Sequence, residues 1–126
     1  MKICIVIPAH NEELYLAKTV ESLINQSLRP FKLVLVNDNS TDTTGEIMSN
    51  YSDNYEWIEA INLISEDKHI PGSKIVDAFL KGFETIKTEY DIICKFDADL
   101  IFEKNYLSAI VSHFDNNPKL GMVSGF

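Results

Sequence analysis

Short runs of apolar, mostly β-branched residues alternate with amphipathic helical patterns along the chain, and this alternation limits the possible folds more than any other feature. The strand-like runs are apolar at almost every position, which is typical of strands buried on both faces. Strands of this kind, separated by helices, belong to parallel sheets that carry helices on both faces. We therefore predict an α/β fold with a mostly parallel sheet.

The pattern places four strands, at Lys2–Ile7, Phe31–Val36, Trp57–Leu63 and Asp91–Phe96. Helical spacing predicts four helices, within 11–28, from Thr43, around 76–83 and around 107–114. Asn11 is expected to cap the first helix, and Thr43 with Glu46 to form a capping box at the second. The closing letters "LGMVSGF" resemble the start of a fifth strand.

Each predicted strand is followed by a cluster of polar residues. In chain order these clusters are "PAHNEE", "NDNSTD", "SEDKHIPGSK" and "DAD". The carboxyl ends of parallel strands meet at one edge of a sheet, and ligands bind in the crevice outside that edge. The sequence therefore predicts a single ligand site at this edge.

Asp97 and Asp99, separated only by Ala98, are the most informative of these residues. In extended backbone the two carboxylates would project from the same face, and like charges side by side cost free energy unless a cation or a proton relieves them. One interpretation is a pair of hard oxygen ligands for Mg²⁺ or Mn²⁺. The other is capping of the following helix. The pattern alone leaves both open.

Three further positions each allow a structural and a functional interpretation. Asp38 suits either turn chemistry or a hydrogen bond from a nucleobase or ribose. Glu12 suits the start of a helix and also the predicted site. Lys74 is either a solvated lysine or a cation for a bound diphosphate. The histidines have no metal-ligand spacing with cysteine, and we assign no role to His10, His69 and His113.

Charge and cysteine content restrict the partners and the compartment. The formal net charge is −8, which argues against nucleic acid or an anionic membrane surface as the main partner. Cys4 and Cys94 lie in apolar runs, where unpaired thiols suit a reducing compartment. No stretch is long enough to span a bilayer, and "KICIVIP" is too short for a secretory signal. We expect a cytoplasmic protein.

Four segments of the chain, taken together, resemble a known protein family. The segments "IVIPAHNEELYLAKTVESLINQS", "LVLVNDNSTDTT", "GSKIVDAFLKGFE" and "KFDADLIFEKNYLSAIV" resemble, in order and spacing, the N-terminal half of family 2 glycosyltransferases. The resemblance implies a Rossmann-like GT-A fold, with residues 1–126 as the nucleotide-sugar-binding part. It also implies inverting transfer from a nucleotide diphosphate sugar, with a UDP-sugar favoured and Mn²⁺ or Mg²⁺ as cofactor. The acceptor would be a carbohydrate or a lipid-linked molecule.

The resemblance also implies roles for individual residues. Nucleotide-binding positions would be Pro8, Ala9, Glu12, Asp38, Lys74 and Asp97. Among these, Asp38 would contact the base, typically uracil, and Lys74 would lie near the nucleotide. Asp99 would be the direct metal ligand, and Asp97 would reach the ribose or the metal.

The chain departs from the family pattern in two respects. The family often has Asp-Asp-Gly-Ser where this chain has Asn37-Asp38-Asn39-Ser40, which leaves the choice between UDP and GDP open. The acceptor half and the general base of an inverting enzyme are expected beyond Phe126. We therefore expect residues 1–126 alone to bind the donor without transferring sugar.

Other classes fit less well. A non-catalytic nucleotide or nucleotide-sugar binding module is the main alternative. A receiver-type signalling domain would carry an acidic pair after the first strand, where this chain has Pro8-Ala9-His10. A phosphatase of the haloacid dehalogenase type would carry its D-x-D motif near the start of the domain, with Thr or Val in place of Ile101.

Overall fold

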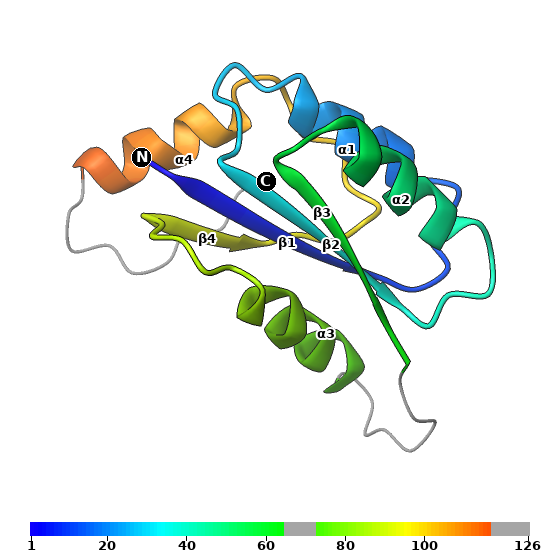
Figure 1. The fold of residues 1–126 in the computed structure, drawn as a ribbon. Coiled ribbons are helices and arrows are strands. Elements are labelled where there is room, and N and C mark those ends of the chain that lie inside the picture. The colour runs from blue at the N-terminus through cyan, green and yellow to red at the C-terminus, as the bar shows by residue number, and fades with distance from the viewer. Residues whose placement is uncertain (65–72, 117–126) are drawn as a thin grey trace.

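A four-stranded parallel sheet forms the centre of the molecule (Figure 1). The computed structural model describes residues 1–64 and 73–116, with the backbone alone for residues 73–76. The strands are β1 (Ile3–Ala9), β2 (Lys32–Asp38), β3 (Ile58–Leu63) and β4 (Ile92–Lys95), and their order in the sheet is β3-β2-β1-β4. The predicted α/β fold with a parallel sheet is confirmed.

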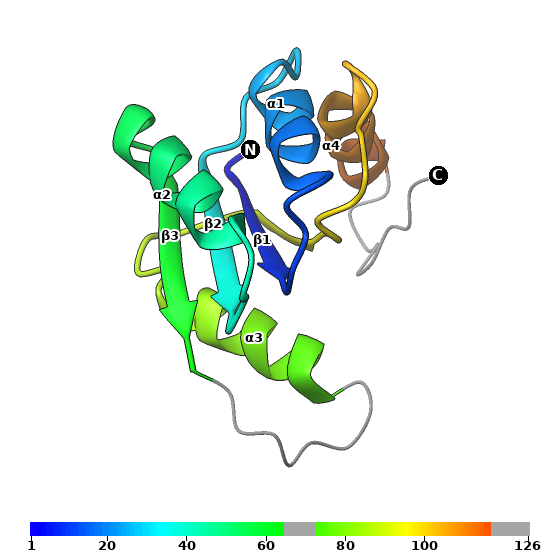
Figure 2. The same ribbon diagram turned by 90° about the vertical axis from the view of Figure 1, so that its right-hand side faces the viewer.

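Helices cover both faces of this sheet, as predicted (Figures 1 and 2). The four helices are α1 (Leu16–Ile24), α2 (Thr44–Asn54), α3 (Ser73–Glu84) and α4 (Tyr106–Asn116). Helices α1, α2 and α4 lie on one face, and α3 lies on the other. Figure 2 also shows α1 and α4 side by side.

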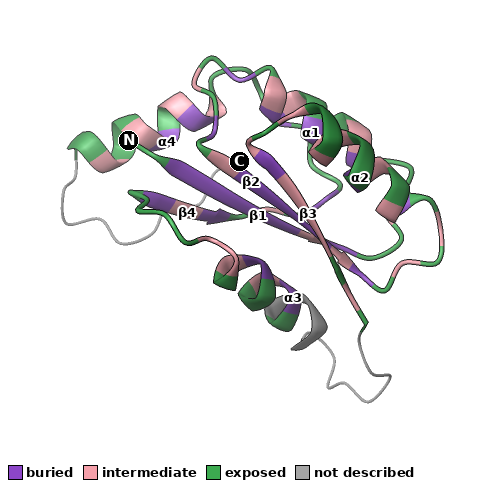
Figure 3. Ribbon diagram, viewed as in Figure 1, coloured by how far each residue is buried: buried purple, intermediate pink, exposed green. Residues whose placement is uncertain are grey.

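The two central strands are buried along their length (Figure 3). Alternate side chains of a strand point to opposite faces. In β1, Ile5 and Ile7 belong to the core under α1, α2 and α4, whereas Val6 packs with Ala78 of α3 on the opposite face. Both faces of β1 and β2 therefore need apolar residues, which explains the continuous apolar runs in the sequence.

The chain reverses its direction across the sheet beside β1. The connections through α1 and α2 lead from β1 to β2 and then to β3, and the connection containing α3 returns to β4 on the other side of β1. The crevice between the carboxyl ends of β1 and β4 is therefore the topological switch point, where sheets of this kind bind ligands.

The predicted helix caps are wrong. Helix α1 begins at Leu16 rather than directly after Asn11, and Asn11 has a left-handed φ of 52°. The side chain of Thr43 does not cap α2. Its hydroxyl donates a hydrogen bond to Glu13, in the loop after β1, instead. The side chains of Asn11 and Thr43 therefore bond to each other's neighbouring loops instead of to the starts of their own helices. The predicted fifth strand, at 120–126, lies outside the described residues.

Both cysteines are free and buried in the sheet. Burial, with a smaller effect of Cys4, raises the pKa of the Cys94 thiol to about 12, so this group stays protonated at neutral pH. Among the described residues, no helix has the length and apolar character needed to cross a bilayer.

Gly82 allows α3 to lie close to the sheet. A Cβ atom at this position would lie 2.6 Å from Val6 Cγ1 and 2.7 Å from Val36 Cγ2. Both distances are well below van der Waals contact, and the atoms met belong to buried, β-branched side chains that cannot rotate away easily. Any larger residue at position 82 must therefore push α3 away from the sheet.

We expect Gly82→Ala to lower the free energy of unfolding by about 1–3 kcal/mol, the usual cost of overpacking a core. Helix propensity alone would predict a gain of about 1 kcal/mol, so the sign of the change distinguishes the two effects. Urea unfolding measures it, with Lys81→Ala at the neighbouring exposed position as the control. A Gly82→Ala protein at least as stable as the wild type would contradict the close approach.

Candidate functional site

A cavity of about 320 Å³ opens at the carboxyl edge of the sheet, the edge at which all four strands end. It lies at the switch point between β1 and β4. Its lining residues are Pro8, Ala9, His10, Glu12, Asp38, Ala78, Asp97, Ala98 and Asp99. The structure thus brings together six of the seven residues predicted from the sequence. Lys74, the seventh, lies in the first turn of α3, and its side chain is outside the described part of the molecule.

The strand ends place these residues. Pro8 and Ala9 are the last two residues of β1, and Asp38 is the last residue of β2. Asp97 and Asp99 follow the end of β4. Ala78 lines the cavity from α3 and is almost fully buried. Its small side chain leaves room for the cavity at this edge of the sheet.

Asp38 is the most unusual residue of the cavity. It is only 7% exposed, yet no described residue donates a hydrogen bond to its carboxylate. A carboxylate can only accept hydrogen bonds, so a ligand that displaces water from the cavity must supply donors to it. Its main-chain oxygen, by contrast, accepts a hydrogen bond of 2.7 Å from His10 Nδ1. The carboxylate, which has no donor among the described residues and lines the cavity, is therefore suited to a ligand that donates hydrogen bonds.

His10 is a cavity residue to which sequence reasoning assigned no role. Because the Asp38 carbonyl can only accept, Nδ1 of His10 must donate, and Nε2 is then the acceptor in the neutral ring. Nε2 lies 3.3 Å from the side-chain nitrogen of Asn11. The sequence signal for His10 is its position directly after a predicted strand, at the edge where ligands bind. The absence of metal-ligand spacing with cysteine does not bear on this role.

The loops after β1 and β2 are tied together by hydrogen bonds between side chains and backbone. The backbone N–H of Asn11 donates to Ser40 Oγ at 3.0 Å. The side-chain oxygen of Asn11, Oδ1, accepts from the backbone N–H of Thr41 at 2.8 Å. The Glu12 amide donates to Thr44 Oγ1 at 2.9 Å. These bonds fix the loop that carries His10 and Glu12 against the end of β2.

Asparagine makes two tight turns in these loops possible. Asn11 and Asn39 have φ values of 52° and 55°. Asparagine tolerates this left-handed region better than most residues. Asn39, at the position where the family often has glycine, thus adopts a backbone conformation that glycine also takes readily.

Asn37, the other departure from the family pattern, has a structural role. Its Nδ2 donates to Asn62 Oδ1 at 2.9 Å, and its Oδ1 accepts from the Ser40 amide at 3.1 Å. The residue does not line the cavity. At this position the amide joins the end of β2 to β3 and to the following turn.

Asp97–Asp99, here called the acidic turn, is not extended. Strand β4 ends at Lys95, one residue before the predicted end at Phe96, and a turn follows, so the extended backbone considered for the two aspartates is not present. The side chain of Asp97 is 66% exposed, with Lys95 Nζ 3.9 Å from Oδ1. Both carboxylates still line the same cavity.

The acidic turn fits a divalent cation only in part. Within the described residues, no group of three or more His, Cys, Asp or Glu side chains could hold a metal ion. Mg²⁺ commonly uses one or two carboxylates and takes its other ligands from phosphate and water. Asp97 and Asp99 match that requirement, provided that a phosphate-bearing ligand is present.

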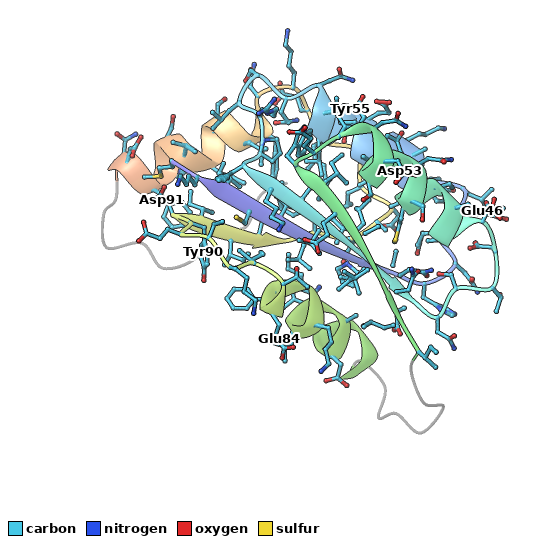
Figure 4. All side chains as sticks on the ribbon, in the orientation of Figure 1. Glu46, Asp53, Tyr55, Glu84, Tyr90 and Asp91 are labelled. Carbon is cyan, nitrogen blue, oxygen red and sulfur yellow. The ribbon has the colours of Figure 1, made fainter. Side chains whose placement is uncertain are left out.

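The cavity concentrates negative charge. Burial raises the pKa of the Glu12 carboxyl, and three neighbouring carboxylates raise it further: Asp99, Asp42 and Asp97. Much of the remaining charge lies elsewhere, on exposed side chains of α2, α3 and the segment before β4 (Figure 4). The cavity is therefore acidic through its own residues, and it favours ligands that bring hydrogen-bond donors or a cation.

The fold is that of the GT-A glycosyltransferases, as the likeness to two solved structures shows. Residues 1–349 of TarS from Staphylococcus aureus, in complex with UDP, superpose with a TM-score of 0.71 and 25% identity, over 94% of this chain and 33% of that one. A mannosyltransferase from Pyrobaculum calidifontis, in complex with GDP-Man and Mn²⁺, gives 0.69 and 15% identity, over 95% of this chain and 34% of that one.

The sequence gives the family. Residues 4–126 match the model of Glycosyl transferase family 2, and the chain belongs to this family. A relative from Bacillus subtilis, "Probable glycosyltransferase YdaM", is 33% identical over 98% of this chain. The chain spans only part of the length of these relatives: 29% of YdaM, 33% of the TarS 1–349 chain and 34% of the mannosyltransferase chain.

Glu12 and Glu13 should affect stability in opposite directions. The folded pKa of Glu12 is above its ordinary value of 4.5, so ionised Glu12 costs stability at neutral pH and the cost disappears as the pH falls. We expect Glu12→Gln to raise the melting temperature at pH 7, with the difference vanishing below about pH 4.5.

Glu13→Gln is the matched comparison. Glu13 Oε2 accepts from the Thr43 amide and hydroxyl, at 3.0 and 2.7 Å, and loss of the charge weakens both bonds. The melting temperature at pH 7 should therefore fall. Thermal unfolding between pH 4 and pH 7 tests both variants, and a destabilised Glu12→Gln protein at pH 7 would contradict the assignment for Glu12.

Proposed function

We propose that this chain is the donor-binding part of an inverting glycosyltransferase that uses a nucleotide diphosphate sugar, with a UDP-sugar favoured. The observation that carries the proposal is the buried carboxylate of Asp38, which lacks a donor among the described residues and lines the same cavity as the acidic turn. One end of the cavity thus suits a nucleobase and the other a metal-bound diphosphate. Membership of glycosyltransferase family 2 supports the same assignment.

Asp38 would recognise the base. A carboxylate is an acceptor only, and uracil offers one ring N–H group as a donor. Burial makes this contact selective, because a base without a donor at that position would leave the carboxylate unpaired. Pro8 and Ala9 would contact the nucleoside partly through their backbones, and Glu12 would lie at the same end.

Asp99 would bind a Mn²⁺ or Mg²⁺ ion directly, and Asp97 would reach the ribose or the same ion. Such an ion stabilises the negative charge that develops on the departing nucleoside diphosphate. The complex of the Pyrobaculum mannosyltransferase with GDP-Man and Mn²⁺ supports this part of the proposal. Lys74 would add a cationic side chain near the nucleotide.

The acceptor and the general base belong to the rest of the proposed reaction. We assign the cavity carboxylates to the donor and the cation, so the base that deprotonates a carbohydrate or lipid-linked acceptor would come from outside this set. The free, buried thiols of Cys4 and Cys94 suit a reducing compartment such as the cytoplasm. Release of UDP that depends on an acceptor, from UDP-sugars supplied to the full-length protein, would test transfer itself.

The base contact is tested by Asp38→Asn, which keeps the size of the side chain and replaces one acceptor oxygen by a donor. We expect the affinity for UDP in Mn²⁺ to fall at least tenfold, about 1.4 kcal/mol, and the affinity for pyrophosphate to stay the same. Calorimetric titration with UDP, GDP, ADP and pyrophosphate measures this. Asp53→Asn, on the exposed surface of α2, is the control. ADP binding more tightly than UDP would contradict the assignment.

The metal contact is tested by Asp99→Ala. We expect it to lower the Mn²⁺-dependent affinity for UDP by at least about tenfold, and Asp97→Ala to cost less if Asp97 reaches the metal only indirectly. The same titrations should show weak Mn²⁺ binding without UDP, because two carboxylates are few ligands for the ion. An affinity for UDP that EDTA leaves unchanged would exclude the metal from donor binding.

A further inference from the structure

Helix α1 and the residues directly after it carry polar side chains on the face that packs against the segment after β4. Thr19 is fully buried, Gln26, two residues beyond the end of α1, is 7% exposed, and Ser22 lies between them on the same face. A buried polar group lowers stability unless it is hydrogen bonded, so an apolar residue would be the default at each position. The cavity contains none of the three, and donor binding as proposed above does not use them.

Thr19 bonds to the acidic turn itself. Its Oγ1 lies 2.8 Å from the main-chain oxygen of Ala98 and 3.2 Å from that of Tyr15. A threonine inside a helix ordinarily donates to the carbonyl four residues earlier, which here is Tyr15. The hydroxyl has a single proton, and the shorter distance favours the bond to Ala98. Helix α1 therefore holds the peptide between Ala98 and Asp99, inside the pair of aspartates.

Ser22 and Gln26 continue this contact along the same segment. Ser22 Oγ accepts from the Phe102 amide at 3.0 Å and donates to the Thr19 carbonyl at 2.7 Å. Gln26 Nε2 donates to the Glu103 carbonyl at 2.6 Å, and its Oε1 accepts from the Leu107 amide at 3.0 Å. The last bond satisfies an amide in the first turn of α4, as a cap would.

This set of contacts, the α1 ladder, reaches residues that have no strand or helix to hold them. The segment between Lys95 and Tyr106 contains no regular secondary structure. Ala98 is buried, and its carbonyl lies between the two cavity aspartates in the chain. A change in the backbone angles at Ala98 would alter how the two carboxylates lie relative to each other, and the hydrogen bond from Thr19 opposes such a change.

We propose that Thr19 is a positioning residue for the donor site, which holds the acidic turn in the conformation that binds the cation and the diphosphate. Ser22 and Gln26 fix the following segment in the same way. The effect on donor binding rests on the proposed function. The restraint of the acidic turn by α1 is independent of any ligand.

Thr19→Val in the full-length protein is the main test, since valine keeps the shape and removes the donor. Thr85→Val is the matched control, because Thr85 Oγ1 donates to the Gly82 carbonyl at 2.7 Å at the end of α3, outside the cavity lining. Thr19→Ser restores the hydroxyl. Ser22→Ala provides a second variant that releases the Phe102 amide if Thr19→Val does not fold.

Two measurements separate positioning from general stability. In calorimetric titration, Thr19→Val should weaken binding of UDP with Mn²⁺ about tenfold and leave uridine, which lacks the diphosphate, within twofold. Thr19→Ser should recover most of the UDP affinity, and Thr85→Val should change neither. In hydrogen exchange without ligands, peptides covering residues 96–103 should exchange faster in Thr19→Val and in Ser22→Ala, but not in Thr85→Val.

Several results would overturn the proposal. Equal losses of affinity for UDP and uridine, or equal losses in Thr19→Val and Thr85→Val, would make Thr19 an ordinary structural residue. If the wild-type protein bound no nucleotide, the proposed function would fail. The exchange rates of residues 96–103 would still decide whether Thr19 restrains the acidic turn, and unchanged rates in Thr19→Val would refute the restraint.

Discussion

The pairing of β1 with two parallel neighbours is the constraint on which the rest of the molecule depends. The register pairs Ala9 with Asn37 of β2, and Val6 with Lys95 of β4. Pro8 is two residues beyond Val6, and Asp97 is two residues beyond Lys95, so these two residues follow the same pair. The register therefore brings the end of β1, the end of β2 and the acidic turn to the same level of the sheet. A shift of one residue would separate them and also turn the apolar side chains of β1 to the wrong faces.

The sheet alone does not fix the backbone beyond the strand ends, and side chains from neighbouring elements complete the site. The loops after β1 and β2 hold each other through Asn11 and Thr44. The acidic turn has no such partner loop in the described structure and is held from α1 by Thr19. Rigid helices and strands thus supply the geometry, and hydrogen bonds transfer it to the loops that bear the functional groups.

The sequence was sufficient to predict the strands and the edge that binds ligands, because both follow from local pattern and general rules. Continuous apolar runs identified β1 and β2, and the position of Asp38 and Asp97 after strands placed both at one edge. The helix caps failed because Asn11 and Thr43 found partners some thirty residues away, in another loop. A distant contact of this kind depends on strand order, which local rules cannot give.

The role of Thr19 illustrates the same limit more strongly. Its partner is 79 residues away in the chain, and in the sequence Thr19 is simply one polar residue beside Val20. The conformation of the acidic turn could not be predicted either. An apolar run indicates that a strand is present, but pairing with β1 determines where it ends, and that pairing stops at Lys95.

The charges of the cavity place a condition on the proposed donor. Glu12, Asp38, Asp97 and Asp99 line the cavity that would receive the nucleotide, and a diphosphate entering this cavity without a cation would be repelled. A cation entering alone would find only two of these carboxylates on the acidic turn. Each ligand supplies what the other lacks, so their binding free energies must be coupled, and the coupling is reciprocal. On the proposed function, the nucleotide and the metal are therefore best regarded as one ligand, which the acidic turn binds as a unit.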